Sequence, residues 1–401
     1  MKILLINKFL YPKGGAENYL LKLGNLLEQQ GHEVQYFGMV DSKNVVGNEK
    51  QLLVSPIDFS TGILKNVAAP LRIIYNAEAR RKLYQVLNDF CPDVVHLNNI
   101  QYHLTPSVIL AVRDYRRKRN PKLKLVSTAH DYQLICPNHG LFDSRGQYCE
   151  HCLHGSFFHC FIRKCVKNSH LKSLLAVMDA FVWKISRAYE QLDVIICPSE
   201  FMKSKLEQDV RFKGKCVVLN NFVEAIQEKE IDKKDYVLEF GHLSKEKGTL
   251  MLVEAAKRLP DIPFVFAGFG PAEEEVRKLK NAKLAGYQSG EVLEQLIREA
   301  RITVIPSLWS ENCPYSVLES QMYGTAVIGS NMGGIPELLR NGRGMIFEAG
   351  NIEDLTRKIR LLWNDEDLRT TLSECAKKPL ESTDSYYEKL MKLYGGLNEN
   401  I

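Results

Sequence analysis

Short apolar runs alternate along the chain with longer stretches in which apolar positions recur every three or four residues. The apolar runs at 2–6, 34–37 and 94–97 are each bounded by glycine, proline or polar residues. Short runs of this kind are typical of parallel strands that are buried on both faces. The stretches at 16–30 and 105–118 predict amphipathic helices. The first half of the chain therefore predicts a parallel sheet wound by helices.

The same alternation continues in the second half. Apolar runs at 236–241 and 302–305 are separated by stretches with helical spacing. A chain of 401 residues usually exceeds what one core serves, so we expect two domains, each an α/β doubly wound parallel sheet. We place the domains at 1–198 and 199–378, followed by a helical segment at 379–401.

Three finer expectations concern single segments. The run at 216–222 is assigned to the second half of the chain. The arginine-rich stretch at 71–90 and the stretch at 171–190 are each expected to form one continuous helix.

The most informative stretch runs from Ile302 to Leu338. An apolar strand leads into a loop that carries Glu311, and Pro314 then suits the first position of a helix. Glu319 lies inside this helix, and Gly324 stands just past its end as a C-cap. Free amides and the helix dipole make the start of a helix an anion site, and nearby carboxylates suit hydroxyl groups. The stretch therefore predicts a ligand that is both phosphate and polyol.

Two glutamates eight positions apart are followed by a glycine pair and a Pro-Glu pair: Glu311, Glu319, Gly333, Gly334, Pro336 and Glu337. This arrangement resembles the Glu-x7-Glu and GG-x-PE signature of the retaining GT4-type glycosyltransferases, which have the GT-B fold. The resemblance implies two Rossmann-like domains that face a central cleft. Residues 1–198 would bind the acceptor, residues 199–378 would bind a nucleotide-sugar donor, and the helix at 379–401 would cross back to the first domain.

A second element, FGHLSKEKG at 240–248, looks like the part of the family in which arginine and lysine neutralise the donor diphosphate. Lys247 matches the lysine, but His242 stands where arginine is usual. Arginine is a permanent bidentate phosphate donor, whereas an ordinary histidine offers one N–H and loses its charge near pH 6.5. Three explanations compete: a weaker phosphate clamp, compensation by Lys245, or lost transferase activity. We favour compensation.

The resemblance implies three catalytic residues, namely His130, Lys247 and Glu311. His130 resembles the family histidine that faces the donor sugar, although a hydrogen-bonded core histidine is the plain alternative. We expect His96, inside an apolar run, either to serve packing or to support the site residues from behind. Glu311 would hold the sugar hydroxyls, and Glu319 the ribose. The implied donor-binding residues are Gly14, Gly15, His242, Lys247, Gly270, Asn312, Cys313, Pro314, Tyr315, Ser316 and Glu319.

The implied reaction is the retaining transfer of a hexose from a UDP- or GDP-sugar to a glycan or a polyprenyl-pyrophosphate-linked acceptor, in surface polysaccharide, capsule or lipopolysaccharide synthesis. The family is usually discussed as front-face transfer in which the leaving phosphate takes the acceptor proton, so we assign no general base. Because no DxD motif stands beside a sheet end, we expect catalysis without metal or other cofactor. Two alternatives stay open: a GT-B nucleotide-sugar epimerase, and a non-catalytic glycan-binding or scaffold protein whose donor site has decayed at His242.

The net charge of +5 is unevenly distributed. Residues 1–200 carry 25 lysines and arginines against 17 aspartates and glutamates, partly in a run from Arg113 to Lys124. This excess is either a solvated surface or attracts anionic lipid headgroups or a pyrophosphate-linked acceptor. Nucleic acid is not expected, because no aromatic residues interleave the basic run. With no apolar run of the roughly 18 to 20 residues that a membrane span requires and no signal-peptide cleavage site, we expect a cytoplasmic protein that touches the inner face of the plasma membrane.

Five of the ten cysteines lie in one insert, residues 136–165. A C-x2-C pair flanked by further cysteines in a cytosolic chain favours structural zinc over a disulfide. The most symmetric four ligands are Cys136, Cys149, Cys152 and Cys165, with Cys160 or a histidine as substitutes. The plain alternative is an insert of small buried thiols.

Overall fold

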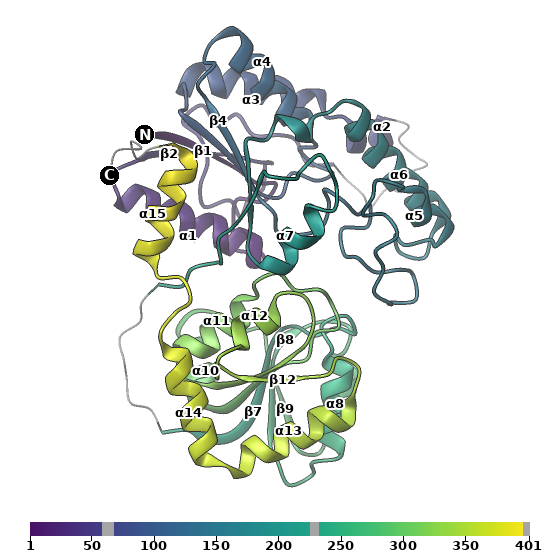
Figure 1. The fold of residues 1–401 in the computed structure, drawn as a ribbon, viewed down its shortest axis with the longest axis vertical. Helices are drawn as coiled ribbons and strands as arrows, with labels where there is room; N and C mark the ends of the chain where they lie inside the picture. The colour runs from purple at the N-terminus through teal and green to yellow at the C-terminus, as the bar shows by residue number, and fades with distance from the viewer. Residues whose placement is uncertain (58–67, 225–231, 396–401) are drawn as a thin grey trace. The chain divides into compact units, whose positions relative to one another are not determined.

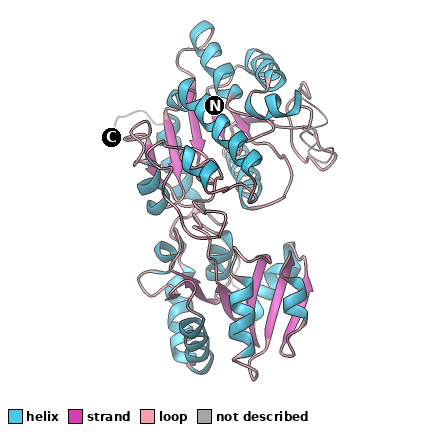
Figure 2. Cartoon of the chain, turned by 90° about the vertical axis from the view of Figure 1, so that its right-hand side faces the viewer, coloured by secondary structure: helices cyan, strands magenta, loops and turns pink. Residues whose placement is uncertain are grey.

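The computed structural model describes residues 1–57, 68–224 and 232–395. Its contacts divide the chain into two compact units. The first unit comprises residues 1–198, 202–219 and the chain from 384 onward, and the second comprises 199–201 and 220–383. Within each unit, helices flank a parallel sheet (Figures 1 and 2).

The first unit is built on six parallel strands in the order β2-β1-β3-β4-β5-β6. These strands are β1 (Lys2–Ile6), β2 (Glu33–Phe37), β3 (Val94–Leu97), β4 (Lys124–Thr128), β5 (Val194–Cys197) and β6 (Cys216–Val218). Its helices are α1 (Gly15–Gln29), α2 (Ala68–Ile74), α3 (Ala77–Phe90), α4 (Ser107–Lys118), α5 (Phe158–Ile162), α6 (His170–Ile185), the 3-10 helix η1 (Tyr189–Gln191), α7 (Glu200–Leu206), which starts in the second unit, and α15 (Thr383–Tyr394). The strand order reverses between β1 and β3, which makes their carboxyl ends a switch point.

The second unit has six parallel strands in the order β12-β11-β10-β7-β8-β9. These strands are β7 (Lys234–His242), β8 (Phe264–Phe269), β9 (Ala282–Gly286), β10 (Ala300–Ile305), β11 (Ala326–Ser330) and β12 (Met345–Phe347). Its helices are α8 (Thr249–Lys257), α9 (Glu273–Arg277), α10 (Gly290–Glu299), α11 (Tyr315–Met322), α12 (Ile335–Leu339), α13 (Ile352–Asn364) and α14 (Glu366–Lys377). Here the order reverses between β7 and β10, so a ligand site is expected at their carboxyl ends.

The strand residues of the apolar runs form the cores. In the second unit Val237, Phe266, Ile302 and Ile328 are fully buried and share one cluster with residues of α8 and α13. Burial on both faces explains why these strands read as continuous apolar runs.

The division between the units differs from the boundary expected at residue 198. The segment assigned from sequence to the second half contains β6, which pairs in parallel with β5 and places Cys216 opposite Ile195. The first unit therefore extends to Leu219. A short apolar run predicts a strand. It does not predict which sheet the strand joins, because that depends on pairing with residues far away in the chain.

Two expected helices are shorter than predicted. The stretch at 71–90 forms α2 and α3, because Asn76 leaves the helical conformation and its side chain accepts a hydrogen bond from the Ala79 N–H at 3.1 Å. The stretch at 171–190 forms α6, which ends at Ile185, and is followed by η1.

The sequence predicts the C-terminal end of α11 correctly, whereas its N-terminal end needs one correction. Gly324 adopts φ +68°. Its N–H bonds to the Gln321 carbonyl, and the Thr325 N–H bonds to the Ser320 carbonyl. These bonds confirm the C-cap. Pro314 is the N-cap, with φ −67° and ψ 127°, rather than the first helical residue.

The C-terminal helix α15 lies within the first unit. Its Tyr386 hydroxyl is hydrogen-bonded to the Tyr19 hydroxyl, and its Tyr394 hydroxyl is hydrogen-bonded to His96 Nδ1. The last residues of the segment expected at 379–401, 396–401, lie outside the described part of the chain.

Candidate active site

The second unit brings two loops together at its switch point. One loop follows β7 and carries Lys247, and the other follows β10 and carries Glu311. The Leu308 and Trp309 N–H groups both bond to the Glu246 carbonyl, at 2.9 and 3.0 Å. These backbone bonds hold the two loops edge to edge at the carboxyl ends of neighbouring strands, where α/β sheets bind ligands.

An ion pair joins the two loops. Lys247 Nζ lies 2.5 Å from Glu311 Oε1, and the same oxygen accepts a hydrogen bond from Ser307 Oγ at 3.1 Å. The glutamate side chain is 13% exposed and the lysine side chain is 41% exposed, so the cation can still turn toward a ligand. The sequence predicted both charged residues, but it did not predict Ser307, whose one signal was its place just after a strand.

Glycines let the backbone approach Glu311 closely. Gly333 has φ +58°, and a Cβ on it would lie 2.1 Å from the Glu311 carbonyl oxygen. A Cβ on Gly334 would lie 1.9 Å from the Asn312 carbonyl oxygen, and its N–H donates to the Glu311 carbonyl at 2.6 Å. The glycine pair therefore fixes the position of the loop that presents Glu311.

Gly248 has the same role on the other loop. It has φ +81°, and a Cβ there would lie 1.8 Å from the Pro306 carbonyl oxygen. Glu337 caps a backbone segment, because its carboxylate accepts hydrogen bonds from the N–H groups of Glu200 and Phe201 at 2.8 and 2.7 Å. The other motif residues near Lys247 and Glu311, three glycines and Glu337, thus mainly fix the conformation of the backbone in this region.

The start of α11 lies directly after this loop. The Pro314 carbonyl accepts the Val317 N–H, and the N–H groups of the first turn before Val317 have no partner within the helix. Tyr315, Ser316 and Glu319 are partly buried on this helix. An eight-residue helix that begins four residues after the carboxylate paired with Lys247 suits a diphosphate carrying a polyol.

Cys313 contributes packing to this region. Its side chain belongs to an apolar cluster with Val317 and Ile335, and burial raises its pKa to about 12. Its carbonyl accepts a hydrogen bond from the Asn221 side chain at 2.9 Å. Any contact with a donor would therefore come from the backbone of Cys313.

His242 and Gly270 lie at the ends of β7 and β8. His242 is exposed, and its ring meets the Phe269 ring edge-on at 5.6 Å. Phe269 in turn lies 6.0 Å from the Tyr287 ring, and both aromatic side chains are mostly exposed. A Cβ on Gly270 would lie 2.2 Å from the Leu243 carbonyl oxygen, so this glycine serves close backbone packing. Sequence reasoning missed the two aromatic residues.

The first unit presents His130 at the carboxyl end of β4. Its Nε2 donates to Asn98 Oδ1 at 2.8 Å, and the Tyr19 ring packs edge-on at 5.0 Å. Burial lowers the pKa of His130 to about 3, so the ring is neutral at pH 7. His96 is fully buried and hydrogen-bonded to Tyr394 and Thr128, which confirms its packing role.

Gly14 and Gly15 begin α1 in the same unit. Gly14 is the N-cap with extended backbone, and both glycines are exposed. A Cβ on Gly14 would meet only Glu17 Oε2, at 3.4 Å, so its surroundings leave room for a ligand. Glu17 closes the loop by accepting the Asn7 side-chain N–H at 3.2 Å.

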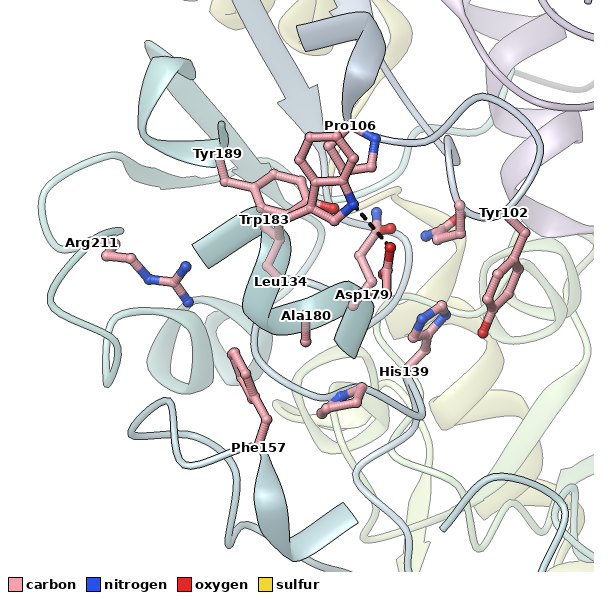
Figure 3. A pocket seen from close by; sticks show the side chains of 13 residues that line it. Tyr102, Pro106, Leu134, His139, Phe157, Asp179, Ala180, Trp183, Tyr189 and Arg211 are labelled. Atoms are coloured by element: carbon pink, nitrogen blue, oxygen red, sulfur yellow. Dashed lines mark hydrogen bonds between the residues drawn. The ribbon is translucent and has the colours of Figure 1, made fainter. Parts of the chain in front are cut away.

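The first unit also contains a small cavity of about 20 Å³ between α6 and the loops after β3 and β4 (Figure 3). This volume holds about one water molecule. Of the described residues that line this cavity, Gln101 and Gln133 each have a buried side-chain oxygen without a hydrogen-bond partner. Burial raises the pKa of Asp179 to about 7, and its carboxylate accepts the Trp183 Nε1–H at 2.9 Å. The cavity suits a structural water and is too small for a sugar.

The cysteine-rich insert gathers thiols in an apolar cluster. Cys152 and Cys160 are buried with Phe157, and Cys165 packs against them. Burial raises the pKa of Cys152 to about 12 and that of Cys136 to about 11. Within the described ranges, no three cysteine, histidine or acidic side chains form a group that could hold a metal ion. Zinc at Cys136, Cys149, Cys152 and Cys165 stays a prediction, which the zinc content of the purified protein would test.

Two further observations bear on the basic run and on membranes. Arg116 pairs with Asp193 and donates to the Leu123 carbonyl, and Arg113 pairs with Asp114, so part of the run is used inside the unit. No helix in the described part of the chain has both the length and the apolar character to cross a membrane.

Two family descriptions cover most of the chain. Residues 13–226 match the family described as Glycosyltransferase Family 4, and residues 222–379 match the family described as Glycosyl transferases group 1.

Individual proteins agree with these matches. The chain is 25% identical over 420 residues to an uncharacterized 42.6 kDa protein in the cps region of Klebsiella pneumoniae, covering 99% of this chain and 100% of that protein. It is 30% identical over 178 residues to the N,N'-diacetylbacillosaminyl-diphospho-undecaprenol alpha-1,3-N-acetylgalactosaminyltransferase of Campylobacter jejuni, covering 43% of this chain and 47% of that protein, or about half of its length.

The structure is similar to that of Anabaena HepE in complex with UDP-glucose, with a TM-score of 0.67, 16% identity and coverage of 99% and 100% of the two chains. A likeness at this identity supports the fold. Together with the matched families, it agrees with the two doubly wound sheets. The chain belongs to glycosyltransferase family 4 and has the GT-B fold.

Proposed function

We propose that the chain is a retaining hexosyltransferase that transfers a sugar from a nucleotide-sugar donor without a catalytic metal. The observation that carries the proposal is the Lys247–Glu311 ion pair at the β7/β10 switch point, beside the start of α11. A cation, a carboxylate and helix amides at one sheet edge provide separate partners for the phosphates and the hydroxyls of a nucleotide sugar.

The donor would displace the internal partner of each charge. Lys247 would turn from Glu311 to the diphosphate, with the amides of Tyr315 and Ser316 and the exposed His242 around it. Glu311 would then hold sugar hydroxyls, and Glu319 the ribose. HepE is described in complex with UDP-glucose, which supports UDP as the first nucleotide to test, with GDP as the second.

The chemical contribution of these residues would be electrostatic. Departure of the nucleoside diphosphate leaves negative charge on the phosphates, and Lys247 and the helix amides would stabilise it. In front-face transfer the departing phosphate oxygen accepts the acceptor's proton, so no side chain serves as a general base. His130 is neutral at pH 7 and would therefore act through hydrogen bonds rather than as a positive charge.

For the acceptor we propose a glycan carried on a polyprenyl diphosphate at the inner face of the plasma membrane. The name of the Campylobacter jejuni relative specifies an undecaprenol-linked diphospho-sugar, and the Klebsiella pneumoniae relative is placed in a cps region. These two names support a role in the synthesis of a surface polysaccharide. The proposed acceptor is thus lipid-linked and anionic.

Thermal unfolding with UDP, GDP, ADP and CDP tests the proposal, because a ligand bound only by the native state raises the midpoint. We expect one nucleotide to raise it, and Lys247→Ala to weaken the effect. Lys257→Ala is the matched control, because Lys257 also pairs with a glutamate at 2.5 Å and is 48% exposed. A midpoint that no nucleotide shifts would favour a scaffold with a decayed donor site.

Product analysis separates the two enzymatic alternatives. A transferase should release nucleoside diphosphate in step with sugar transfer to an added lipid-linked acceptor. A nucleotide-sugar epimerase would convert the donor sugar with no acceptor present, and this result would replace the transferase proposal.

A further inference from the structure

An exposed apolar stripe runs along α6. Its members recur at intervals of three and four residues and are each between 38% and 78% exposed. They are Leu171, Leu174, Met178, Val182 and Ile185. At about 100° per residue their side chains fall within an arc of about 80°, so they form one face of the helix.

This face is separate from the one that packs on the unit. Ser173, Ala176, Val177 and Trp183 are the buried positions of α6. Figure 3 shows Trp183 and Asp179 on the side that lines the small cavity. The helix therefore has a packing face and, on its other side, a second apolar face whose side chains remain 38% to 78% exposed. A helix that is apolar beyond its packing face is typical of one that meets an apolar medium or a partner.

The short helix α5, next to α6, also exposes apolar side chains. It packs against α6 (Figure 1), and its Phe158 and Ile162 are 55% and 61% exposed. These two residues are four positions apart and lie on one side of α5. We call the seven exposed apolar side chains on these two neighbouring helices the α5–α6 face.

The charged residues of the segment that leads into α6 and forms its first half are basic. Residues 151–178 contain no aspartate or glutamate, and their charged residues are Arg163, Lys164, Lys167 and Lys172. Arg163 pairs with Asp143, whereas Lys167 and Lys172 are exposed at the start of α6. An apolar stripe with lysines at its border is the composition of helices that lie in the headgroup region of an anionic bilayer.

We propose that the α5–α6 face docks on an anionic phospholipid surface, with the apolar stripe inserted at the headgroup boundary and Lys167 and Lys172 on lipid phosphates. The inference rests on the proposed lipid-linked acceptor, since such an acceptor is presented at that surface. A second copy of this chain is the less suitable occupant. A twofold contact through the same face would bring the exposed Lys167 and Lys172 of one copy toward those of the other.

Vesicle flotation of the full chain tests the proposal. We expect it to float with phosphatidylcholine vesicles that contain about 30% phosphatidylglycerol, and to float much less with phosphatidylcholine alone or at high salt. The double variant Leu174→Glu with Met178→Glu should lower the partition coefficient by about tenfold or more, because it places two carboxylates in the stripe. Lys167→Gln with Lys172→Gln should lower it several-fold and reduce its salt dependence.

Leu361→Glu is the matched control, because Leu361 is 42% exposed on α13 of the second unit, where we propose no contact. Equal flotation of the stripe variant and this control would overturn the proposal. If the wild type runs as a dimer in gel filtration and the stripe variant runs as a monomer, the partner of this face is a second copy of the chain and not a lipid surface. Because flotation needs no donor, UDP binding measured in parallel reports separately on the proposed transferase, and the stripe variant should keep it.

Discussion

The two units wind the same kind of sheet but hold their polar groups in opposite ways. In the second unit the charges of Lys247 and Glu311 stay partly accessible, and glycines fix the backbone that presents them. In the first unit, burial keeps His96 and His130 neutral. The comparison teaches that a shared strand order sets where a site lies, whereas the burial of individual side chains sets which charge state it offers.

The largest expected effect comes from removing either partner of the Lys247–Glu311 ion pair in the second unit. Lys247→Ala should lower kcat/KM by about 10²- to 10³-fold, or about 3 to 4 kcal/mol, because the leaving diphosphate loses its cation. Glu311→Gln should lower kcat by a similar factor while nucleotide binding largely persists. Steady-state kinetics with the identified donor measure both, and Lys257→Ala should stay near wild type. If the Lys257→Ala control also lost activity, loss of any surface ion pair would lower activity as much as loss of the Lys247–Glu311 pair.

A second prediction concerns Glu239, a buried carboxyl in β7 that accepts the Thr249 hydroxyl at 2.7 Å. Burial raises its pKa to about 8, above its unfolded value. Its folded form therefore keeps a proton that the unfolded chain loses, and the free energy of unfolding should fall as pH rises from about 4.5 to about 8.

Glu239→Gln should remove this dependence, which amounts to about 3 kcal/mol between pH 5 and 8. Thermal midpoints across this range measure the change. Glu254→Gln, on the exposed surface of α8, is the control and should leave the slope unchanged. An unaltered slope in Glu239→Gln would mean that the carboxyl is ionised in the folded state.

A third prediction separates close packing from backbone strain. Gly333→Ala combines a positive φ with a Cβ only 2.1 Å from the Glu311 carbonyl oxygen, whereas Gly350→Ala has φ +84° and no atom within 4 Å. Both should cost about 1 kcal/mol for the left-handed conformation. Only Gly333→Ala should cost about 2 kcal/mol more and lower turnover, because it shifts the Glu311 loop. Equal unfolding midpoints would argue that the loop adapts freely.

The smallest expected effect lies in the first unit. Burial lowers the pKa of His96 to about 3, so its folded form binds no proton where the unfolded chain does. Stability should therefore fall as pH drops below about 6.5, by about 1 kcal/mol between pH 7 and 5.5. His96→Gln should remove this contribution, measured as the wild-type-to-variant difference in midpoint at each pH.

The difference must be taken between proteins, because the raised pKa of Asp179 acts in the opposite direction in the same unit. His154→Gln, at an exposed position, is the control. A constant difference between wild type and His96→Gln across pH would show that folding does not shift the pKa of His96.

The amino-acid sequence by itself determined the class of fold and the donor-side candidates. Apolar runs buried on both faces announced the strands, and the run of glutamates, proline and glycines identified the loop and helix of the second unit. These features are local, because a strand, a turn and a helix start are encoded within a few neighbouring residues.

Tertiary structure alone decided the rest. It assigned β6 to the first sheet, joined Lys247 to Glu311 across 64 residues, and placed α15 in the first unit. It also exposed one apolar face of α6, although the helix is apolar on both sides in sequence. Strand partners, burial and protonation depend on contacts between residues that are distant in the chain. The spacing of apolar residues along the sequence does not predict those contacts.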